Sequence, residues 1–273
     1  MTGTTTSVSS DEVMTPPITA CPIGARCSDP SVSAKASGTV PNTMNTELAR
    51  FNMIEQQIRP WDVLDPAVLE LLGAMRREDF VPATWRALAF VDTQVPLMAG
   101  APDGACMLEP KVEARLLQEL KLQRHETVLE IGTGSGFMAA LLAHRAMRVH
   151  TLECRPELAR SAREVLRRNG VSNATVHEVG AARGALGDFG QPAEAPFDAI
   201  VLSGSVAEVP PTLLELLKPG GRLAAIVGME PIMTARLVTR SGPGHPGHFA
   251  EADLFDTVAP RLLGFAEPTR FSF

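Results

Sequence analysis

The sequence predicts an α/β fold with a doubly wound, mostly parallel β-sheet, a helical layer before it and an antiparallel hairpin at its end. Three observations predict this fold. Apolar strand segments and helix segments alternate strictly after Pro110. A glycine-rich turn over residues 132–136 joins a buried strand to a helix. A turn-forming segment over residues 241–248 separates the last two expected strands, as in a long hairpin.

Composition divides the 273 residues into three parts. Residues 1–43 are rich in Ser, Thr, Pro and Gly and have no periodic apolar pattern, so we expect a disordered N-terminal extension. Residues 44–110 predict the helical layer, and residues 111–273 predict the sheet domain with its C-terminal hairpin. The hydrophobic content of 45% is enough for one large core or two modest cores.

The helical layer begins with two expected helices. Apolar residues recur at helical spacing from Leu48 to Ile58 and stop before a proline. Asp65 as a cap and Pro66 in the first turn are typical of the start of a second helix. The prolines and aromatic residues over 77–97 then predict a loop-rich segment. The charged run Arg76–Asp79 at its start is interpreted as a solvated, self-paired helix end.

The sheet domain is expected to alternate between helices and strands. The segment 197–202 is apolar throughout, as is typical of a strand that is buried on both faces. The expected helices cover residues 111–121, 136–145, 156–169 and 210–217, and the expected strands cover residues 127–131, 148–153, 174–178, 197–202, 222–227, 233–240 and 249–258.

The glycine-rich turn is the most informative motif. Glycine has no Cβ, so the backbone of this turn can approach a ligand closely, next to the free N–H groups that begin the following helix. Glu153 ends the next strand, where a carboxylate can accept hydrogen bonds from both hydroxyls of a ribose. We therefore expect a Rossmann-like site for a nucleotide-like ligand. Its predicted residues are Glu130, Gly132, Thr133, Gly134, Ser135, Gly136 and Glu153.

Two ligands compete for this site, a nicotinamide dinucleotide and S-adenosylmethionine. The dinucleotide pattern Gly-x-Gly-x-x-Gly fails when it is counted from Gly132, because its sixth position is Phe137, and from Gly134 it fits only in its permissive form. An anionic Glu130 before the glycines opposes a pyrophosphate and suits the ammonium and sulfonium charges of S-adenosylmethionine. The closing hairpin also favours S-adenosylmethionine, because the sheet of a dehydrogenase normally ends in parallel strands. A third possibility, a structural glycine turn that binds no ligand, would leave the position of Glu153 unexplained.

Charge and cysteine content argue against several classes of protein. The net charge of −6 and the pI near 5.6 argue against a nucleic-acid groove, and no run approaches the roughly 18 apolar residues that a membrane span needs. His245 and His248 have no nearby set of further ligands, so no metal site is predicted. The cysteines show no paired spacing and suggest a reducing cytoplasm: Cys21, Cys27, Cys106 and Cys154.

Several short motifs occur in the order of one known enzyme family. The most specific runs from Arg77 to Pro82 (REDFVP), and the others are Ala89–Asp92, Pro96-Leu97, Glu130–Gly136, Phe197–Ile200 and Leu217–Leu223. From about Met44 to Phe273 the chain resembles the protein-L-isoaspartate O-methyltransferases, which have the class I methyltransferase fold. The resemblance implies an S-adenosylmethionine-dependent enzyme that methylates isoaspartyl carboxylates in damaged proteins or peptides.

Two departures from the family's motifs keep other functions open. The family's Thr-Ile-Ser-Gln-Pro appears here as residues 106–110, with Leu108 at the place of the serine that lies near the transferred methyl. No catalytic residue is therefore assigned, and we expect Leu108 to make the acceptor pocket less polar. The family's Gly-Asp-Gly appears as Val179-Gly180-Ala181, without an acid.

The alternatives are a methyltransferase for a small carboxylate or a hydroxyl acceptor, and a non-catalytic module that binds S-adenosylmethionine. An ionised carboxylate needs no general base, so the loss of one hydroxyl does not by itself exclude methyl transfer. Ser203 and Ser205, at the carboxyl edge of the sheet, are candidates for lining the acceptor pocket. The oligomeric state is left open by the sequence.

Overall fold

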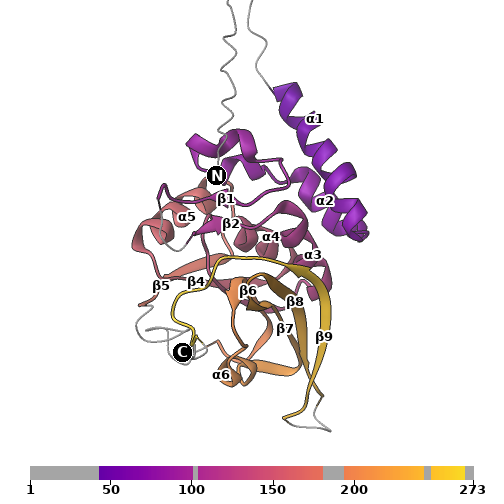
Figure 1. Ribbon diagram of the computed structural model, residues 1–273, viewed down its shortest axis with the longest axis vertical. Coiled ribbons are helices and arrows are strands. Elements are labelled where there is room, and N and C mark those ends of the chain that lie inside the picture. The colour runs from indigo at the N-terminus through magenta and orange to yellow at the C-terminus, as the bar shows by residue number, and fades with distance from the viewer. Residues whose placement is uncertain (1–42, 101–103, 181–193, 243–246, 268–273) are drawn as a thin grey trace, which may run out of the picture. The chain divides into compact units, whose positions relative to one another are not determined.

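The structure is a computed structural model, and it describes residues 43–100, 104–180, 194–242 and 247–267 (Figure 1). The extension expected to be disordered, residues 1–43, lies outside the described residues except for Thr43. Cys21, Cys27, His245 and Ala181 also lie outside them.

A seven-stranded sheet forms the centre of the domain, with the strand order β5-β4-β3-β6-β7-β8-β9. Neighbouring strands from β5 to β7 are parallel, whereas β8 is antiparallel to both β7 and β9. The predicted α/β sheet with a closing antiparallel hairpin is confirmed. The strands are β3 (Thr127–Ile131), β4 (Arg148–Glu153), β5 (Ala174–Glu178), β6 (Phe197–Val206), β7 (Leu217–Met229), β8 (Ile232–Arg240) and β9 (Phe249–Thr257).

The helices follow the expected order, with short 3₁₀ and π segments in the N-terminal layer. The predicted cap is present, since Asp65 Oδ1 accepts the backbone N–H of Ala67 at 2.8 Å. The helices are α1 (Thr43–Met53), α2 (Pro66–Ala74), α3 (Pro110–Leu120), α4 (Phe137–Arg145), α5 (Pro156–Arg168) and α6 (Pro211–Leu214). The short segments are η1 (Ile54–Ile58), η2 (Arg59–Trp61), η3 (Arg77–Asp79) and η4 (Ala83–Leu88), and the small ladder of β1 (Val95–Pro96) and β2 (Cys106–Met107) precedes α3.

Strand β7 covers Leu217–Met229 instead of the predicted residues 222–227, and two neighbouring elements also differ from the sequence prediction. Helix α6 stops at Leu214 instead of residue 217, because Leu217 already pairs with Phe197 in the sheet. Strand β6 continues four residues beyond the predicted end at 202, since its last residues pair with β7. In both cases a contact between distant segments replaces the local preference.

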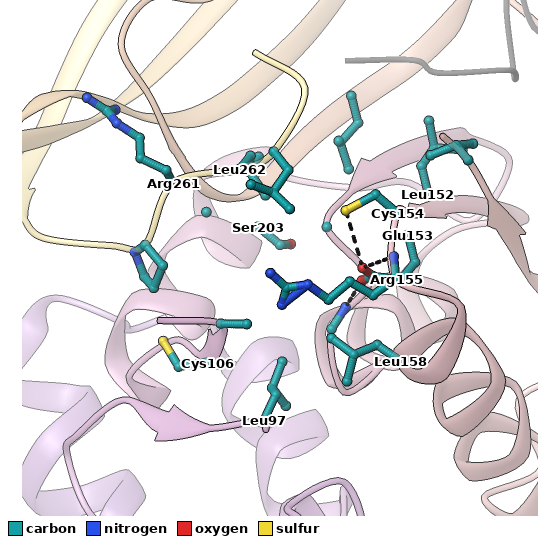
Figure 2. Close-up of a pocket in the computed structure, with 18 residues that line it drawn as sticks. Leu97, Cys106, Leu152, Glu153, Cys154, Arg155, Leu158, Ser203, Arg261 and Leu262 are labelled. Carbon is teal, nitrogen blue, oxygen red and sulfur yellow. Dashed lines mark hydrogen bonds between the residues drawn. The ribbon is translucent and has the colours of Figure 1, made fainter. Parts of the chain in front are cut away.

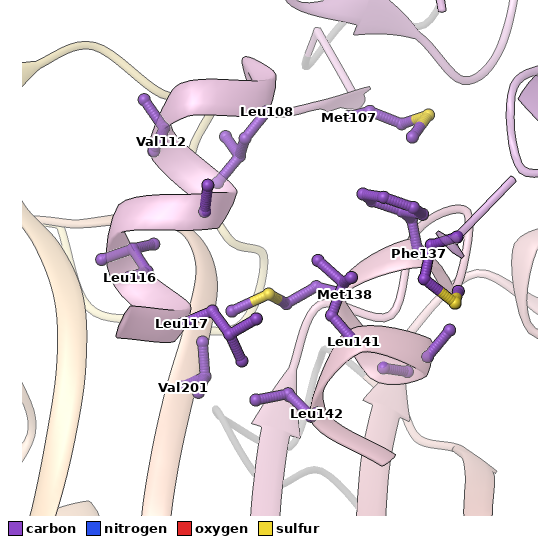
Figure 3. Packing of buried hydrophobic residues seen from close by; sticks show 14 of the residues in the cluster. Met107, Leu108, Val112, Leu116, Leu117, Phe137, Met138, Leu141, Leu142 and Val201 are labelled. Carbon is purple, nitrogen blue, oxygen red and sulfur yellow. The ribbon is translucent and has the colours of Figure 1, made fainter. Parts of the chain in front are cut away.

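The core lies on both faces of the sheet. Val128 and Val201 face an apolar cluster built from α3, α4, α5 and the N-terminal layer, whereas Leu129 and Ile200 face a second cluster that includes α6. Figure 3 shows the first cluster, in which side chains of α3 and α4 meet Val201 of β6. Each of these fully buried aliphatic side chains stabilises the fold by about 1.5–3 kcal/mol.

Arg77 connects the N-terminal layer to this core. Its side chain is 1% exposed and forms an ion pair with Glu113 of α3, which is also buried. Arg77 Nη2 also donates to the carbonyl of Leu108 at 2.8 Å, and the guanidinium lies 4.7 Å from the centre of the Phe137 ring. The interpretation of Arg77 as part of a solvated helix end is therefore wrong. Arg76 is the exposed member of that motif.

We expect Arg77→Met to lower the free energy of unfolding by about 3 kcal/mol, because the carboxyl of Glu113 then stays buried without its cation. Burial already raises the pKa of Glu113 to about 7, so uptake of a proton limits the loss. Urea unfolding at pH 7 measures the change. The double variant with Glu113→Met should regain much of it, and the exposed Arg76→Gln is the control. A loss in Arg77→Met no larger than in the control would contradict this role.

Candidate functional site

A pocket lies at the carboxyl ends of β3, β4 and β6, where β3 has a parallel neighbour on each side (Figure 2). This reversal of strand order is where open α/β sheets bind ligands. The space is about 720 Å³ when the part open to solvent is included. The lining residues come from the glycine turn, the segment 152–155, the end of β6, the C-terminal segment 260–263 and the β1–β2 region.

The glycine turn lies where the sequence places it. Gly132 and Gly134 line the pocket, whereas Thr133, Ser135 and Gly136 are not among the lining residues. The backbone N–H groups of Gly132 and Thr133 both donate to the carbonyl of Leu152, at 2.9 and 3.1 Å. Gly132 has a φ of +95°, which only glycine adopts at little cost. The end of β3 is thereby tied to the end of β4.

Ser135 and Gly136 begin helix α4. The hydroxyl of Ser135 accepts the backbone N–H of Phe137 at 3.2 Å, and Gly136 is the residue before the first turn of the helix. A Cβ at Gly136 would lie 3.4 Å from Ala162 of α5. Ser135 thus supports the first turn of α4, and Gly136 allows that turn to lie close to α5.

Glu153 ends β4 at the pocket and is 5% exposed. Its Oε2 accepts the backbone N–H of Gly134 at 2.8 Å, and its Oε1 accepts the N–H of Arg155 at 3.0 Å. Burial raises the pKa of this carboxyl, while the backbone donors, first among them Gly134, act against the rise. The carboxylate retains lone pairs for the hydroxyls of a ligand, so the geometry suits the predicted role.

Glu130 lies beneath the pocket and does not line it. The side chain is fully buried, and its two oxygens accept hydrogen bonds from the hydroxyls of Thr151 and Ser203, each at 2.7 Å. Thr133 joins this network through Thr151, at 2.6 Å between the two hydroxyl oxygens. Burial raises the pKa of Glu130 to about 8. The hydrogen bonds from Thr151 and Ser203 act against this rise, and the role of Glu130 toward a bound ammonium or sulfonium group stays a prediction.

A C-terminal strap, residues 259–263, crosses the carboxyl edge of the sheet and forms one wall of the pocket. Ser205 fixes it with three hydrogen bonds: its N–H donates to Pro260 at 2.8 Å, its hydroxyl donates to Ala259 at 2.7 Å, and its carbonyl accepts from Leu262 at 2.9 Å. Sequence reasoning missed this strap. It carries no motif, and its partner Ser205 was considered only as a candidate pocket residue.

Leu262 of the strap packs over two glycines. A Cβ at Gly132 would lie 2.7 Å from the Leu262 side chain, and one at Gly204 would lie 2.8 Å from it. Gly132 therefore makes room for a side chain of the protein itself, in addition to forming the turn. Gly204, like Gly132, is a residue type that permits close packing at this edge.

The acceptor end of the pocket differs from the expectation. Leu108 is 4% exposed and belongs to the apolar core, where Figure 3 shows it beside α3, and it is not among the lining residues. The expectation that its side chain makes the pocket less polar is wrong. Cys106 lines the pocket instead, and its thiol donates to Gln94 Oε1 at 3.2 Å. Burial, followed by the neighbouring carboxylates, raises the pKa of this thiol to about 12, so it stays neutral.

The hydroxyls of the two serines near the end of β6 are already used in hydrogen bonds within the protein. Ser203 lines the pocket but donates its hydroxyl to Glu130, and the hydroxyl of Ser205 holds the strap. Over the described ranges, no helix has the length and apolar character of a membrane span, and no three His, Cys, Asp or Glu side chains are grouped to hold a metal ion. Cys106 and Cys154 are free thiols.

Comparison with known proteins identifies relatives of this chain. The family model described as protein-L-isoaspartate(D-aspartate) O-methyltransferase matches residues 49–245. A protein-L-isoaspartate O-methyltransferase of Myxococcus xanthus (strain DK1622) is 42% identical over 166 residues, which are 61% of this chain and 74% of the relative. Protein-L-isoaspartate O-methyltransferase 2 of Anaeromyxobacter sp. (strain Fw109-5) is 39% identical over 199 residues, which are 72% of this chain and 78% of the relative.

A solved structure supports the fold. It is the crystal structure of a Plasmodium falciparum protein described as a protein-L-isoaspartate O-methyltransferase, in complex with S-adenosyl-L-homocysteine. The TM-score is 0.64, and the match covers 80% of this chain and 97% of that one. At 18% sequence identity, the likeness concerns the fold alone.

We expect Glu130→Gln to change how stability depends on pH. Folded Glu130 keeps a proton up to a pKa of about 8, whereas an unfolded glutamate releases it near 4.5. The wild type should therefore lose stability as pH rises between these values, by about 1.4 kcal/mol per pH unit at most. Urea unfolding from pH 5 to 9 should show a shallower slope for Glu130→Gln and greater stability of this variant above pH 8.

The exposed Glu157→Gln serves as the control for this measurement, because it removes the same charge from the surface of α5. Parallel stability curves for the wild type and Glu130→Gln across the whole pH range would show that Glu130 is not a buried, protonated carboxyl.

Proposed function

Because the chain belongs to the protein-L-isoaspartate(D-aspartate) O-methyltransferase family, we propose that it methylates isoaspartyl carboxylates of damaged proteins with S-adenosylmethionine as the methyl donor. The chain is an S-adenosylmethionine-dependent carboxyl methyltransferase. The observation that carries this conclusion is the pocket at the point where the strand order reverses, with the glycine turn and Glu153 in its wall.

The pocket fits this cofactor in its chemistry. The Glu153 carboxylate would accept the ribose hydroxyls, and the apolar side chains of Leu158 and Val179 would pack against the adenine. The backbone at Gly132 and Gly134 would border the methionine part. Glu130 would act from below by fixing the ends of three strands, and Thr133, Ser135 and Gly136 by fixing the turn and the start of α4.

When bound, S-adenosylmethionine would supply a methyl group activated by its positively charged sulfur. Transfer of this methyl to a carboxylate oxygen would leave the electron pair of the broken carbon–sulfur bond on sulfur and would require no proton transfer. An isoaspartyl carboxylate is ionised at pH 7 and needs no general base. The tasks left to the protein are to align the two reactants and to exclude water. Leu97 and Leu262 lie on opposite sides of the pocket, and their apolar side chains would exclude water (Figure 2).

Because Leu108 has no hydroxyl where the family has a serine, the identity of the methyl acceptor has to be established by experiment. A small carboxylate or a hydroxyl compound would be the acceptor if isoaspartyl peptides are not methylated, and a non-catalytic module would bind the cofactor without transferring methyl. Location in the cytoplasm remains a prediction from the cysteine content.

We expect the chain to transfer labelled methyl from S-adenosylmethionine to an isoaspartyl peptide and not to the matching aspartyl peptide. Glu153→Gln should raise the Kd for S-adenosylhomocysteine by about tenfold to a hundredfold, because the variant loses charge-assisted hydrogen bonds to the ligand and to Gly134. Isothermal calorimetry measures the affinity, and the exposed Glu157→Gln is the matched control.

Turnover on neither peptide, with cofactor affinity intact in the wild type, would overturn the isoaspartyl assignment. A panel of small carboxylates would then separate a different acceptor from a binding module. Unchanged cofactor affinity in Glu153→Gln would exclude Glu153 from the cofactor site.

A further inference from the structure

The pocket has two walls that come from distant parts of the chain and face each other. One wall belongs to the β1–β2 ladder and consists of Leu97, Ala105 and Cys106. The strap forms the other wall, and Figure 2 shows its Leu262 across the pocket from Leu97 and Cys106. The hydrogen bonds of Ser205 attach the strap to β6 and do not involve the β1–β2 ladder.

The side chain of Gln94 joins the two walls. Gln94 immediately precedes β1, and its Nε2 donates to the carbonyl of Val258, the residue before the strap, at 2.7 Å. The same nitrogen lies 3.3 Å from Oε1 of Glu109, the residue before α3, and Gln94 Oε1 accepts the thiol of Cys106 at 3.2 Å. One amide thus binds the β1–β2 ladder, the start of α3 and the chain that enters the strap.

The partners of Gln94 also fix which way its amide points. An amide group has two N–H donors and one carbonyl acceptor. Here a main-chain carbonyl and a carboxylate lie on the nitrogen side, and the thiol donor lies on the oxygen side. The reverse orientation would place the amide oxygen against two acceptors and is therefore unfavourable. The half-buried side chain consequently has one preferred position between the two walls.

The position of the strap affects the site directly. Leu262 packs where Gly132 and Gly204 have no Cβ, so the strap lies against the glycine turn. A strap that moves away from the β1–β2 ladder would lose this packing and open the pocket to solvent. The hydrogen bond from Gln94 to Val258 opposes this movement.

We propose that Gln94 is a positioning residue that holds the strap closed over the bound cofactor. This inference rests on the proposed function, because the ligand concerned is the cofactor of that reaction. With the strap closed, Leu97 and Leu262 would shield the cofactor from water and keep it aligned. Loss of one hydrogen bond of this kind should weaken the closed state by about threefold to tenfold.

The first test measures how fast S-adenosylhomocysteine leaves the protein. Protein loaded with labelled ligand is diluted into an excess of unlabelled ligand, and the bound label is followed in time. Gln94→Met keeps the length of the side chain without its amide, so the dissociation rate should rise about threefold to tenfold. Gln123→Met removes an amide from an exposed position outside the pocket and should leave the rate unchanged.

The variant Gln94→Glu preserves the shape of the side chain and makes its donor depend on pH. At pH 8 the ionised carboxylate cannot donate to Val258 and lies beside Glu109, so dissociation should be at least as fast as in Gln94→Met. At pH 5.5 uptake of a proton, which the neighbouring carboxylate favours, restores a donor. The rate should then return toward that of the wild type at the same pH, whereas Gln94→Met should show no recovery.

Hydrogen exchange reports whether the strap itself moves. The N–H of Leu262 donates to Ser205, so its protection depends on the attachment of the strap. In the complex with S-adenosylhomocysteine, residues 259–263 should exchange faster in Gln94→Met than in the wild type, while β3 should exchange at the same rate. The melting temperature verifies that each variant is folded, and Gln94→Glu carries the test if Gln94→Met is not.

The possible results are distinct. Wild-type dissociation rates in both Gln94 variants, or unchanged exchange of the strap, would overturn the proposal. Faster exchange in β3 as well as in the strap would show a general structural role and would also overturn it. If the variants behave as expected but the wild type methylates no isoaspartyl peptide, the isoaspartyl assignment fails and the role of Gln94 stands. If the wild type binds no S-adenosylhomocysteine, both fail.

Discussion

The site depends on how the end of β4 holds the turn that follows β3. The carbonyl of Leu152 accepts two N–H groups of the turn, and the carboxylate of Glu153 accepts a third, from Gly134. These bonds fix the backbone in a conformation that has little intrinsic stability, with positive φ at three glycines. The same carboxylate also binds the N–H of Arg155. One side chain thus organises the turn and the start of α5.

The network around Glu130 extends this control to the third strand. Burying a carboxyl is unfavourable unless its oxygens are hydrogen-bonded, and here hydroxyls from β4 and β6 provide both bonds. Burial raises the pKa of Glu130 to about 8, while these two hydrogen bonds act against the rise. A buried, fully hydrogen-bonded group of this kind fixes the relative positions of three strand ends. It thereby supports the geometry of the pocket from below.

Most of the fold could be predicted because its signals are local. Helices α3 to α5 and strands β3 to β5 lie within two residues of their expected ends, since their apolar periodicity agrees with their final environment. Contacts between distant segments could not be predicted in this way. In the sequence Arg77 resembles a surface residue, because its partners Glu113 and Leu108 are distant along the chain. The strap has no recognisable motif, because its hydrogen bonds to Ser205 involve mainly backbone groups. The sequence identified the glycines, Glu130 and Glu153 as site residues. It could not show which of them line the pocket and which lie beneath it.

The structure changes the interpretation of Leu108, which replaces the serine of the family's motif. Read alone, a leucine in place of a serine suggests an acceptor site that has lost its function. The side chain in fact belongs to the core beneath the site, where a hydroxyl would be buried at a cost of about 1–3 kcal/mol unless it found a partner. The leucine therefore stabilises the support of the pocket, and recognition of the acceptor has to come from residues that do reach the pocket. A motif that is lost in the sequence therefore does not imply that the chemistry is lost.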